Sequence, residues 1–262
     1  MENKSFTHLF IEFIAPLAVF FTPLIFLPFT ANYFATPQLA FLVILTLILL
    51  CGVAFDLIFY HTLPQSNSKL RLALVLFGAS IIINLLANPE GRTESLTTHA
   101  PLFISLSVIA YFLSSLPPTS KAKLRIVFAF VASSTLLAIH AIFQLTYLHS
   151  LSILPLYMQT KGFTPTANPL TTISILITAS IVAFIASIHQ RSPLHKYLYL
   201  VSAAISTIAS TAYLSLMLDG GSLAPIILPL SSSWSLLLDS LKDPHNLIFG
   251  VGLTNFSALY TS

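Results

Sequence analysis

The sequence predicts an all-α polytopic membrane protein, a bundle of about seven transmembrane helices. Hydrophobic residues make up 56% of the chain and charged residues only 7%, whereas a soluble domain carries about a quarter charged residues because its surface must be solvated. The apolar residues also gather in stretches of about 17 to 22, the length that a helix needs to cross a hydrocarbon core. These observations exclude a soluble enzyme, a disordered tail and a disulfide-rich secreted scaffold.

Polar or proline-rich breaks separate the apolar stretches from one another. Residues 1–218 are therefore expected to form the transmembrane bundle, and residues 219–262 the start of an extracytoplasmic loop. The predicted spans are 9–29, 39–60, 70–87, 100–116, 126–147, 170–189 and 197–218. The first span lacks a small-residue cleavage site, so we expect a retained signal anchor.

The positions of Lys and Arg predict the orientation, because these residues are retained on the cytoplasmic side during insertion. With a cytoplasmic N-terminus, eight of them fall inside and three fall outside. The inside set is Lys4, Lys69, Arg71, Lys121, Lys123, Arg125, Arg191 and Lys196, and the outside set is Arg92, Lys161 and Lys242. The C-terminal segment is then extracytoplasmic.

One part of this outer segment has the pattern of a short amphipathic helix. Trp234, Leu237, Leu238 and Leu241 repeat at helical spacing, with polar residues between them and Pro244 after them. We expect residues 233–242 to lie on the outer membrane surface as such a helix.

Polar residues in the fifth span are the candidates for substrate binding. His140 and Gln144 lie one helical turn apart, with Tyr147 on nearly the same face, in the outer half of the span. Together with Arg92 and Lys161 of the outer loops, they would form a polar funnel for an anionic headgroup. The alternative is that His140 and Gln144 bond across helices and serve only packing.

Two carboxylates near the predicted cytoplasmic face admit two interpretations. Glu12 and Asp56 are either rim residues that meet water or a basic partner, or a proton-coupling pair in a transporter. The second interpretation requires both groups to lie at the membrane midplane, and their positions in the spans argue against it.

No cofactor, metal site or nucleic-acid interface is predicted. The eight histidines are scattered without a ligand-type spacing, and Cys51 is the single cysteine. The basic residues form no cluster, although the formal net charge is +3. The expected environment is the lipid bilayer.

The order of several segments resembles a known family. These are a proline-containing first span with Pro16 and Pro23, an outer loop over residues 162–170, the Trp234 segment, and the run Phe249-Gly-Val-Gly-Leu-Thr-Asn-Phe256. In this order they resemble the N-terminal portion of bacterial O-antigen ligase-like membrane proteins, relatives of the Wzy-type O-antigen polymerases. In that family a comparable helix and an "FGVGxxNF" turn open the large extracytoplasmic loop.

The resemblance implies a glycosyltransferase of the bacterial inner membrane. Such enzymes transfer a glycan from an undecaprenyl-diphosphate carrier to an acceptor at the outer face, where arginines hold the diphosphate and a loop histidine is a candidate base. That histidine and most of those arginines follow the glycine turn in the family, so no catalytic residue is assigned here. The chain is expected to be a truncated form, inactive alone.

One difference from the family concerns the end of the seventh span. Many members have a Ser-Arg-Gly step there, whereas this chain has Asp219-Gly-Gly221. An acidic residue in place of a phosphate-binding cation argues against ordinary ligase chemistry. Two other functions stay open beside the glycosyltransferase. One is a multi-span transporter or flippase, and the other is a non-catalytic anchor for an extracytoplasmic domain.

Overall fold

The computed structural model describes the residues in the ranges 6–27, 34–60, 69–89, 92–97, 99–114, 121–146, 155, 158–159, 163–166, 168–218, 234–235 and 238–249. Of these residues 87% are helical, and none lies in a strand. The prediction of an all-α fold is therefore confirmed for the described part of the chain. The helices are α1 (Phe6–Phe21), α2 (Ala35–Tyr60), α3 (Lys69–Ala87), α4 (Arg92–Thr97), α5 (His99–Leu113), α6 (Lys121–Leu145), α7 (Pro169–His189), α8 (Pro193–Leu218) and α10 (Pro244–Phe249).

Within the described residues, five helices are long and apolar enough to cross a membrane: α2, α3, α6, α7 and α8. Two more apolar helices, α1 and α5, are shorter, with 16 and 15 residues. A helix of 16 residues measures about 24 Å, less than a hydrocarbon core of about 30 Å. The structure thus supports a multi-pass membrane protein. The count of seven spans and the inside position of the N-terminus stay predictions.

The chain divides into two compact units. The first comprises residues 1–8, 39–117 and 226–262, and the second comprises residues 9–38 and 118–225. Most of α2 belongs to the first unit with α3, α4, α5 and α10. Most of α1 belongs to the second unit with α6, α7 and α8.

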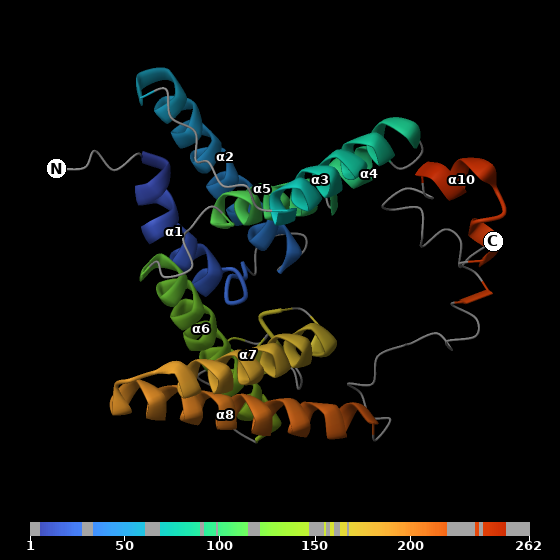
Figure 1. Cartoon of the computed structure of the whole chain (residues 1–262). Helices are drawn as coiled ribbons and strands as arrows, with labels where there is room; N and C mark the ends of the chain where they lie inside the picture. Colours follow the sequence, from blue (N-terminus) through green and yellow to red (C-terminus); the bar gives the residue numbers. More distant parts are fainter. Residues whose placement is uncertain are drawn as a thin grey trace. The chain divides into compact units, whose positions relative to one another are not determined.

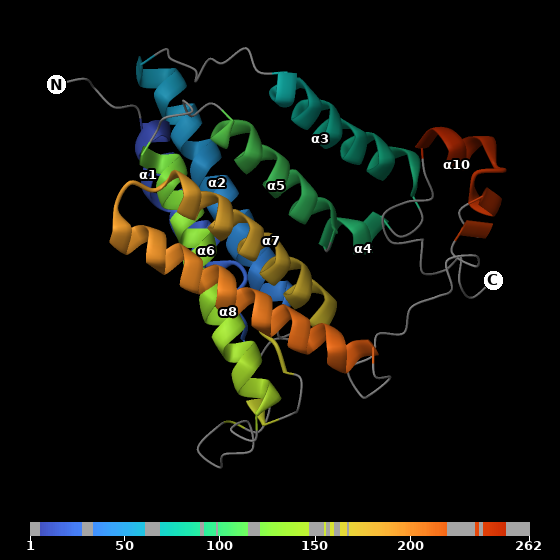
Figure 2. The ribbon, with the colours of Figure 1, turned by 60° about the horizontal axis from the view of Figure 1, so that its bottom comes forward.

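In the second unit, α7 and α8 form an antiparallel hairpin that packs on α6 (Figures 1 and 2). A buried cluster joins the three helices, with Leu137 and Ala141 from α6, Leu176 from α7, and Ala209 and Tyr213 from α8. Small side chains at such contacts let helix backbones approach closely, which is how helices associate in lipid.

One hydrogen bond also links the two helices of this hairpin. The hydroxyls of Ser180 and Thr207 lie 2.7 Å apart. An interhelical hydroxyl pair of this kind adds to the packing contacts in an apolar medium.

In the first unit, α3 and α5 pack against each other through Ile81, Leu85 and Ala100. At one end of this unit the Arg71 guanidinium stacks over the Tyr111 ring at 4.8 Å, and its Nε donates to Ser114 Oγ at 3.3 Å. Arg71, which the charge count places on the cytoplasmic side, thus contacts both α5 and Ser114.

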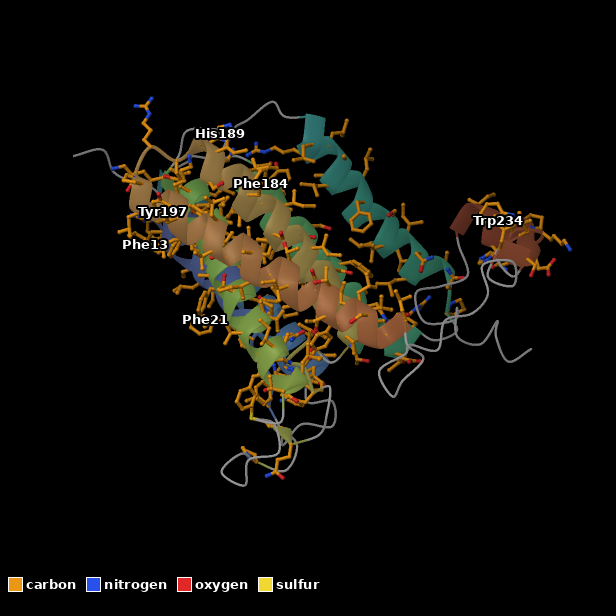
Figure 3. The ribbon with its side chains drawn as sticks, turned by 90° about the horizontal axis from the view of Figure 1, so that it is seen from below. Phe13, Phe21, Phe184, His189, Tyr197 and Trp234 are labelled. Carbon is orange, nitrogen blue, oxygen red and sulfur yellow. The ribbon has the colours of Figure 1, made fainter. Side chains whose placement is uncertain are left out.

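Large apolar side chains cover the outside of the long helices. Leu47, Phe184 and Tyr197 are all more than half exposed, and Figure 3 labels two of these, Phe184 and Tyr197, together with Phe13 and Phe21. A soluble protein rarely exposes so continuous an apolar surface. The surface is suited to lipid chains, as the composition predicts.

The predicted surface helix at 233–242 is described in part. Residues 234–235 and 238–240 are helical, and Trp234, Leu238 and Leu241 are exposed. Lys242 pairs with Asp239 at 2.6 Å on the polar side of the segment. The remaining residues of the predicted helix lie outside the described ranges, and its position on a membrane surface stays a prediction.

Candidate functional site

Two of the four residues predicted to bind substrate, His140 and Gln144, lie in the second unit near the C-terminal end of α6. His140 and Gln144 lie one turn apart on this helix, and residues of the segment between α6 and α7 pack against both. The charge count places this end of the helix at the outer face. We call His140, Gln144 and the residues in contact with them below the α6 polar site.

His140 lies among aromatic rings. Its imidazole meets the Phe163 ring edge-on, with 5.8 Å between centroids, and Phe163 also packs on Phe26 and Phe34 at 5.5 and 5.7 Å. Both ring nitrogens of His140 are buried and have no hydrogen-bond partner among the described residues. A buried polar group without a partner costs stability, so such groups point to a ligand, a water or a further segment of chain.

Gln144 is fully buried and only partly satisfied within the described residues. Its Nε2 donates to the Met158 carbonyl at 3.0 Å, which ties the segment after α6 back onto the helix. Its Oε1 accepts no hydrogen bond from the described residues. Gln144 therefore has a packing role, as the structural alternative proposes, and still presents one acceptor.

A cluster of three threonine hydroxyls holds the segment that leads into α7. The Thr164 hydroxyl lies 2.6 Å from that of Thr166 and 2.8 Å from that of Thr172. The hydroxyls of Thr166 and Thr172 also lie 2.6 Å apart. Phe163 is adjacent to this cluster in sequence, so the hydroxyls help to fix the ring that covers His140.

Gln38 connects two segments that border the site. Its Nε2 donates to the Ile25 carbonyl, after α1, and to the Pro165 carbonyl, before α7, both at 3.2 Å. Gln38, at the start of α2, thus fixes the backbone next to Phe26 and Phe163.

Tyr213 of α8 is a buried polar residue that the sequence analysis did not select. It is fully buried in the same cluster as Leu137 and Ala141, and its hydroxyl has no partner among the described residues. The available signal was its spacing from Ser206 and Ser210, which places three hydroxyls on one face of α8.

The structure shows no contact of Arg92 or Lys161, the two predicted cationic residues, with the α6 polar site among the described residues. Arg92 belongs to the first unit, where Nε and Nη2 donate to the Leu85 and Leu86 carbonyls, each at 2.9 Å, and cap the end of α3. Lys161 lies outside the described residues. Their contribution to the polar funnel stays a prediction.

Each carboxylate near the predicted cytoplasmic face has a partner. Glu12 pairs with Arg125 at 3.4 Å in the second unit. Asp56, almost fully buried in the first unit, accepts a hydrogen bond from the Thr7 backbone N–H at 2.7 Å and thereby caps the first turn of α1. For Glu12, this is the basic partner that the rim interpretation expects.

Histidine, cysteine and acidic side chains do not gather into a group of three or more anywhere in the described ranges. Comparisons of the chain with protein families, with curated proteins and with solved structures found no match.

Proposed function

We propose that this chain is the membrane part of a glycosyltransferase that acts on an undecaprenyl-diphosphate-linked glycan at the outer face of a bacterial inner membrane. The observation that carries the proposal is the α6 polar site, where the His140 ring nitrogens and Gln144 Oε1 are buried without partners among the described residues. Polar groups inside a membrane protein are costly and tend to be functional. The motif order described above supports the choice of substrate.

The proposed reaction is the transfer of the glycan from its diphosphate carrier to an acceptor hydroxyl. An acceptor hydroxyl gives its proton to a general base, for which the family resemblance suggests a loop histidine beyond the glycine turn, and its oxygen attacks the anomeric carbon of the glycan. The bond from that carbon to the diphosphate oxygen breaks, and undecaprenyl diphosphate leaves with the bonding electrons. Cations stabilise the charge that develops on the diphosphate, and we assign this to Arg92 and Lys161. In this proposal the α6 polar site binds the glycan or the headgroup by hydrogen bonds.

The test is glycan transfer by the complete encoded protein in membrane vesicles. We expect His140→Ala and Gln144→Ala each to lower the rate of transfer of a labelled lipid-linked glycan about tenfold, the effect of losing one buried hydrogen bond. Ile139→Ala is the matched control, because Ile139 is the neighbouring residue of α6 and is half exposed.

Transfer by both α6 variants at the rate of the unaltered protein would exclude the α6 polar site from substrate binding. Likewise, unaltered transfer by Arg92→Ala and by Lys161→Ala would remove these two residues from the site. All rates are to be compared at equal amounts of folded protein.

A further inference from the structure

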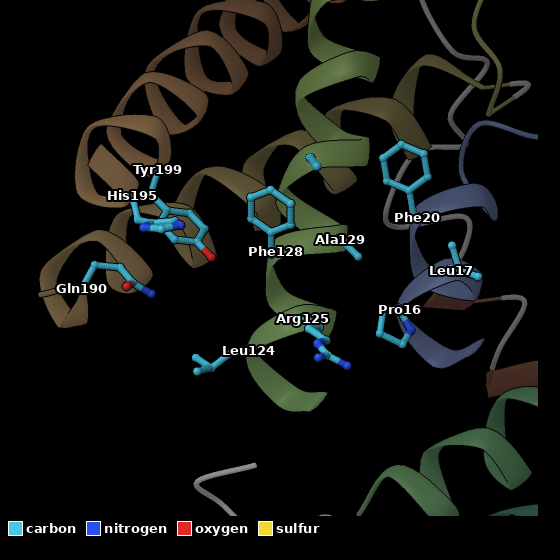
Figure 4. Close-up of a pocket in the computed structure, with 11 residues that line it drawn as sticks. Pro16, Leu17, Phe20, Leu124, Arg125, Phe128, Ala129, Gln190, His195 and Tyr199 are labelled. Carbon is cyan, nitrogen blue, oxygen red and sulfur yellow. The ribbon is translucent and has the colours of Figure 1, made fainter. Parts of the chain in front are cut away.

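A cavity lies near the N-terminal end of α6, away from His140. It measures about 510 Å³ and is lined by α1, α6, α8 and Gln190, all within the second unit (Figure 4). Most of its lining is apolar, with Phe20 of α1 and Phe128 of α6 among the walls. Its volume falls in the range of about 300 to 1,000 Å³ that is typical of small-molecule sites.

The polar side chains of this cavity come from two helices and the segment between α7 and α8. Arg125 is on α6, His195 and Tyr199 are on α8, and Gln190 follows α7. The Arg125 side chain is 46% exposed, and its Nη1 is the atom that pairs with Glu12 at 3.4 Å. A guanidinium has five N–H donors, so Arg125 can hold Glu12 and a second anion together.

An adjoining cavity of about 320 Å³ extends the space along α6 and α8. The two share Phe128, Ala132, His195 and Tyr199, and the second continues to Leu136 and Ser202. The larger cavity extends instead along α1, to Pro16 and Leu17. Two apolar branches thus lead away along α1 and along α6 and α8, and Figure 4 shows Arg125 and His195 on opposite sides of Phe128.

The charges around the cavities favour an anionic occupant. Arg191 lies four residues before His195 and Lys196 directly after it, and both side chains are exposed. Glu12 is the carboxylate paired with Arg125. Basic pockets between transmembrane helices on the cytoplasmic side are typical of sites for anionic lipid headgroups, and the charge count places these residues on that side.

We propose that these two cavities bind one anionic diacyl phospholipid. Its phosphate pairs with Arg125, and its two acyl chains occupy the branches along α1 and along α6 and α8. The exposed apolar residues Leu17 and Phe128 line the entrance, so a lipid can enter from the bilayer. This site is separate from the α6 polar site and does not depend on glycan transfer.

The experiment is native mass spectrometry of the purified protein with phosphatidylglycerol or phosphatidylcholine of identical acyl chains. The unaltered protein is expected to retain one phosphatidylglycerol more strongly than phosphatidylcholine. Arg125→Gln is expected to lower the retention of phosphatidylglycerol about fivefold, the effect of one basic residue at an anionic lipid surface. Lys121→Gln removes an equal charge from the same helix but does not line either cavity, and is expected to retain the lipid.

Ala132→Phe tests the acyl branches, because Ala132 lines both cavities. We expect this variant to lose bound phosphatidylglycerol although all basic residues remain. Equal retention of the two lipids by the unaltered protein would overturn the proposal. This comparison does not depend on whether any variant folds. Equal retention of phosphatidylglycerol by Arg125→Gln and Lys121→Gln would also overturn it.

Discussion

Single polar side chains hold the irregular segments of the second unit onto its helices. Gln38 bonds two backbone carbonyls that are far apart in sequence, and Gln144 bonds a third. Carbonyls outside helices have no partner in the regular hydrogen-bond ladder, so each must be satisfied by a side chain, by water or by another segment. These two glutamine amides therefore decide how the segments around His140 are placed.

Replacing Gln38 is expected to loosen both segments. Gln38→Leu keeps the approximate volume and removes two hydrogen bonds, which lowers the free energy of unfolding by about 1 to 2 kcal/mol. Thermal unfolding in detergent measures the change. Thr36→Ala, an exposed position in the same first turn of α2, serves as the control. Equal unfolding temperatures of the two variants would argue against a role of Gln38 in fixing these segments.

The threonine cluster before α7 is expected to depend on Thr172. Thr172→Val keeps the side-chain shape but removes the buried hydroxyl that bonds Thr164 and Thr166. The expected loss is about 1 kcal/mol of unfolding free energy. Ser174→Ala, which changes an exposed hydroxyl two residues further along α7, is the matched control in the same unfolding measurement. A stability of Thr172→Val equal to that of Ser174→Ala would contradict this account of the cluster.

Residue-scale features were predictable from the sequence only where the partners lie close together in the chain. The proximity of His140 and Gln144 follows from helical spacing alone. The pair of Arg125 with Glu12 joins residues 113 apart, and the bond of Gln38 to Pro165 joins residues 127 apart. Hydropathy and periodicity contain no information on such pairs, because they depend on how the helices pack.

At the scale of elements, the apolar runs predicted the long helices closely, and local chemistry explains their ends. α7 begins after Asn168, whose side chain accepts from the Leu170 N–H at 2.9 Å, with Pro169 in the first turn. Asparagine at this cap and proline next to it are the residues that start helices most readily. The predicted start at residue 170 and the observed start at Pro169 therefore nearly coincide.

α1 ends well before the end of the apolar run that predicted it. The apolar run was predicted to span residues 9–29, but α1 ends at Phe21. Pro23 disfavours helical geometry at Thr22 and lacks the N–H that would continue the hydrogen-bond ladder. An apolar composition continues beyond the helix, which is why a hydropathy count does not detect its end.

The cap of α7 gives a prediction at this scale. Asn168→Ala removes the side-chain acceptor and is expected to lower the free energy of unfolding by about 1 kcal/mol, whereas Asn168→Asp retains it. Thermal unfolding of the two variants measures the difference. If both variants unfold at the same temperature, the cap does not stabilise α7.

Arg92 has a structural role at the end of α3 that must be separated from its proposed role in catalysis. Arg92→Ala leaves the Leu85 and Leu86 carbonyls without their present donors, so some loss of stability is expected. A cation that also stabilises the diphosphate would give a further loss, in the rate per folded molecule. Unfolding and transfer measured on the same preparation distinguish the two roles.

At the scale of the whole molecule, the proposed function depends on the orientation that the basic residues predict. In a protein with Cys51→Ser, we expect Glu90→Cys to react with a membrane-impermeant maleimide in intact spheroplasts. Ser192→Cys, in the segment between α7 and α8, is expected to react only after the membrane is opened. The reverse labelling pattern would place the α6 polar site on the cytoplasmic side and exclude transfer at the outer face.

The central claim is that the protein cleaves a lipid-linked glycan from its diphosphate carrier and does not carry it across the bilayer. Both events can be measured in one proteoliposome preparation of the complete encoded protein, with a labelled undecaprenyl-diphosphate-linked glycan and an acceptor. The account predicts release of undecaprenyl diphosphate together with labelled acceptor, and no movement of intact donor between leaflets. Movement of intact donor without cleavage would contradict it and would identify the transporter alternative as the correct one.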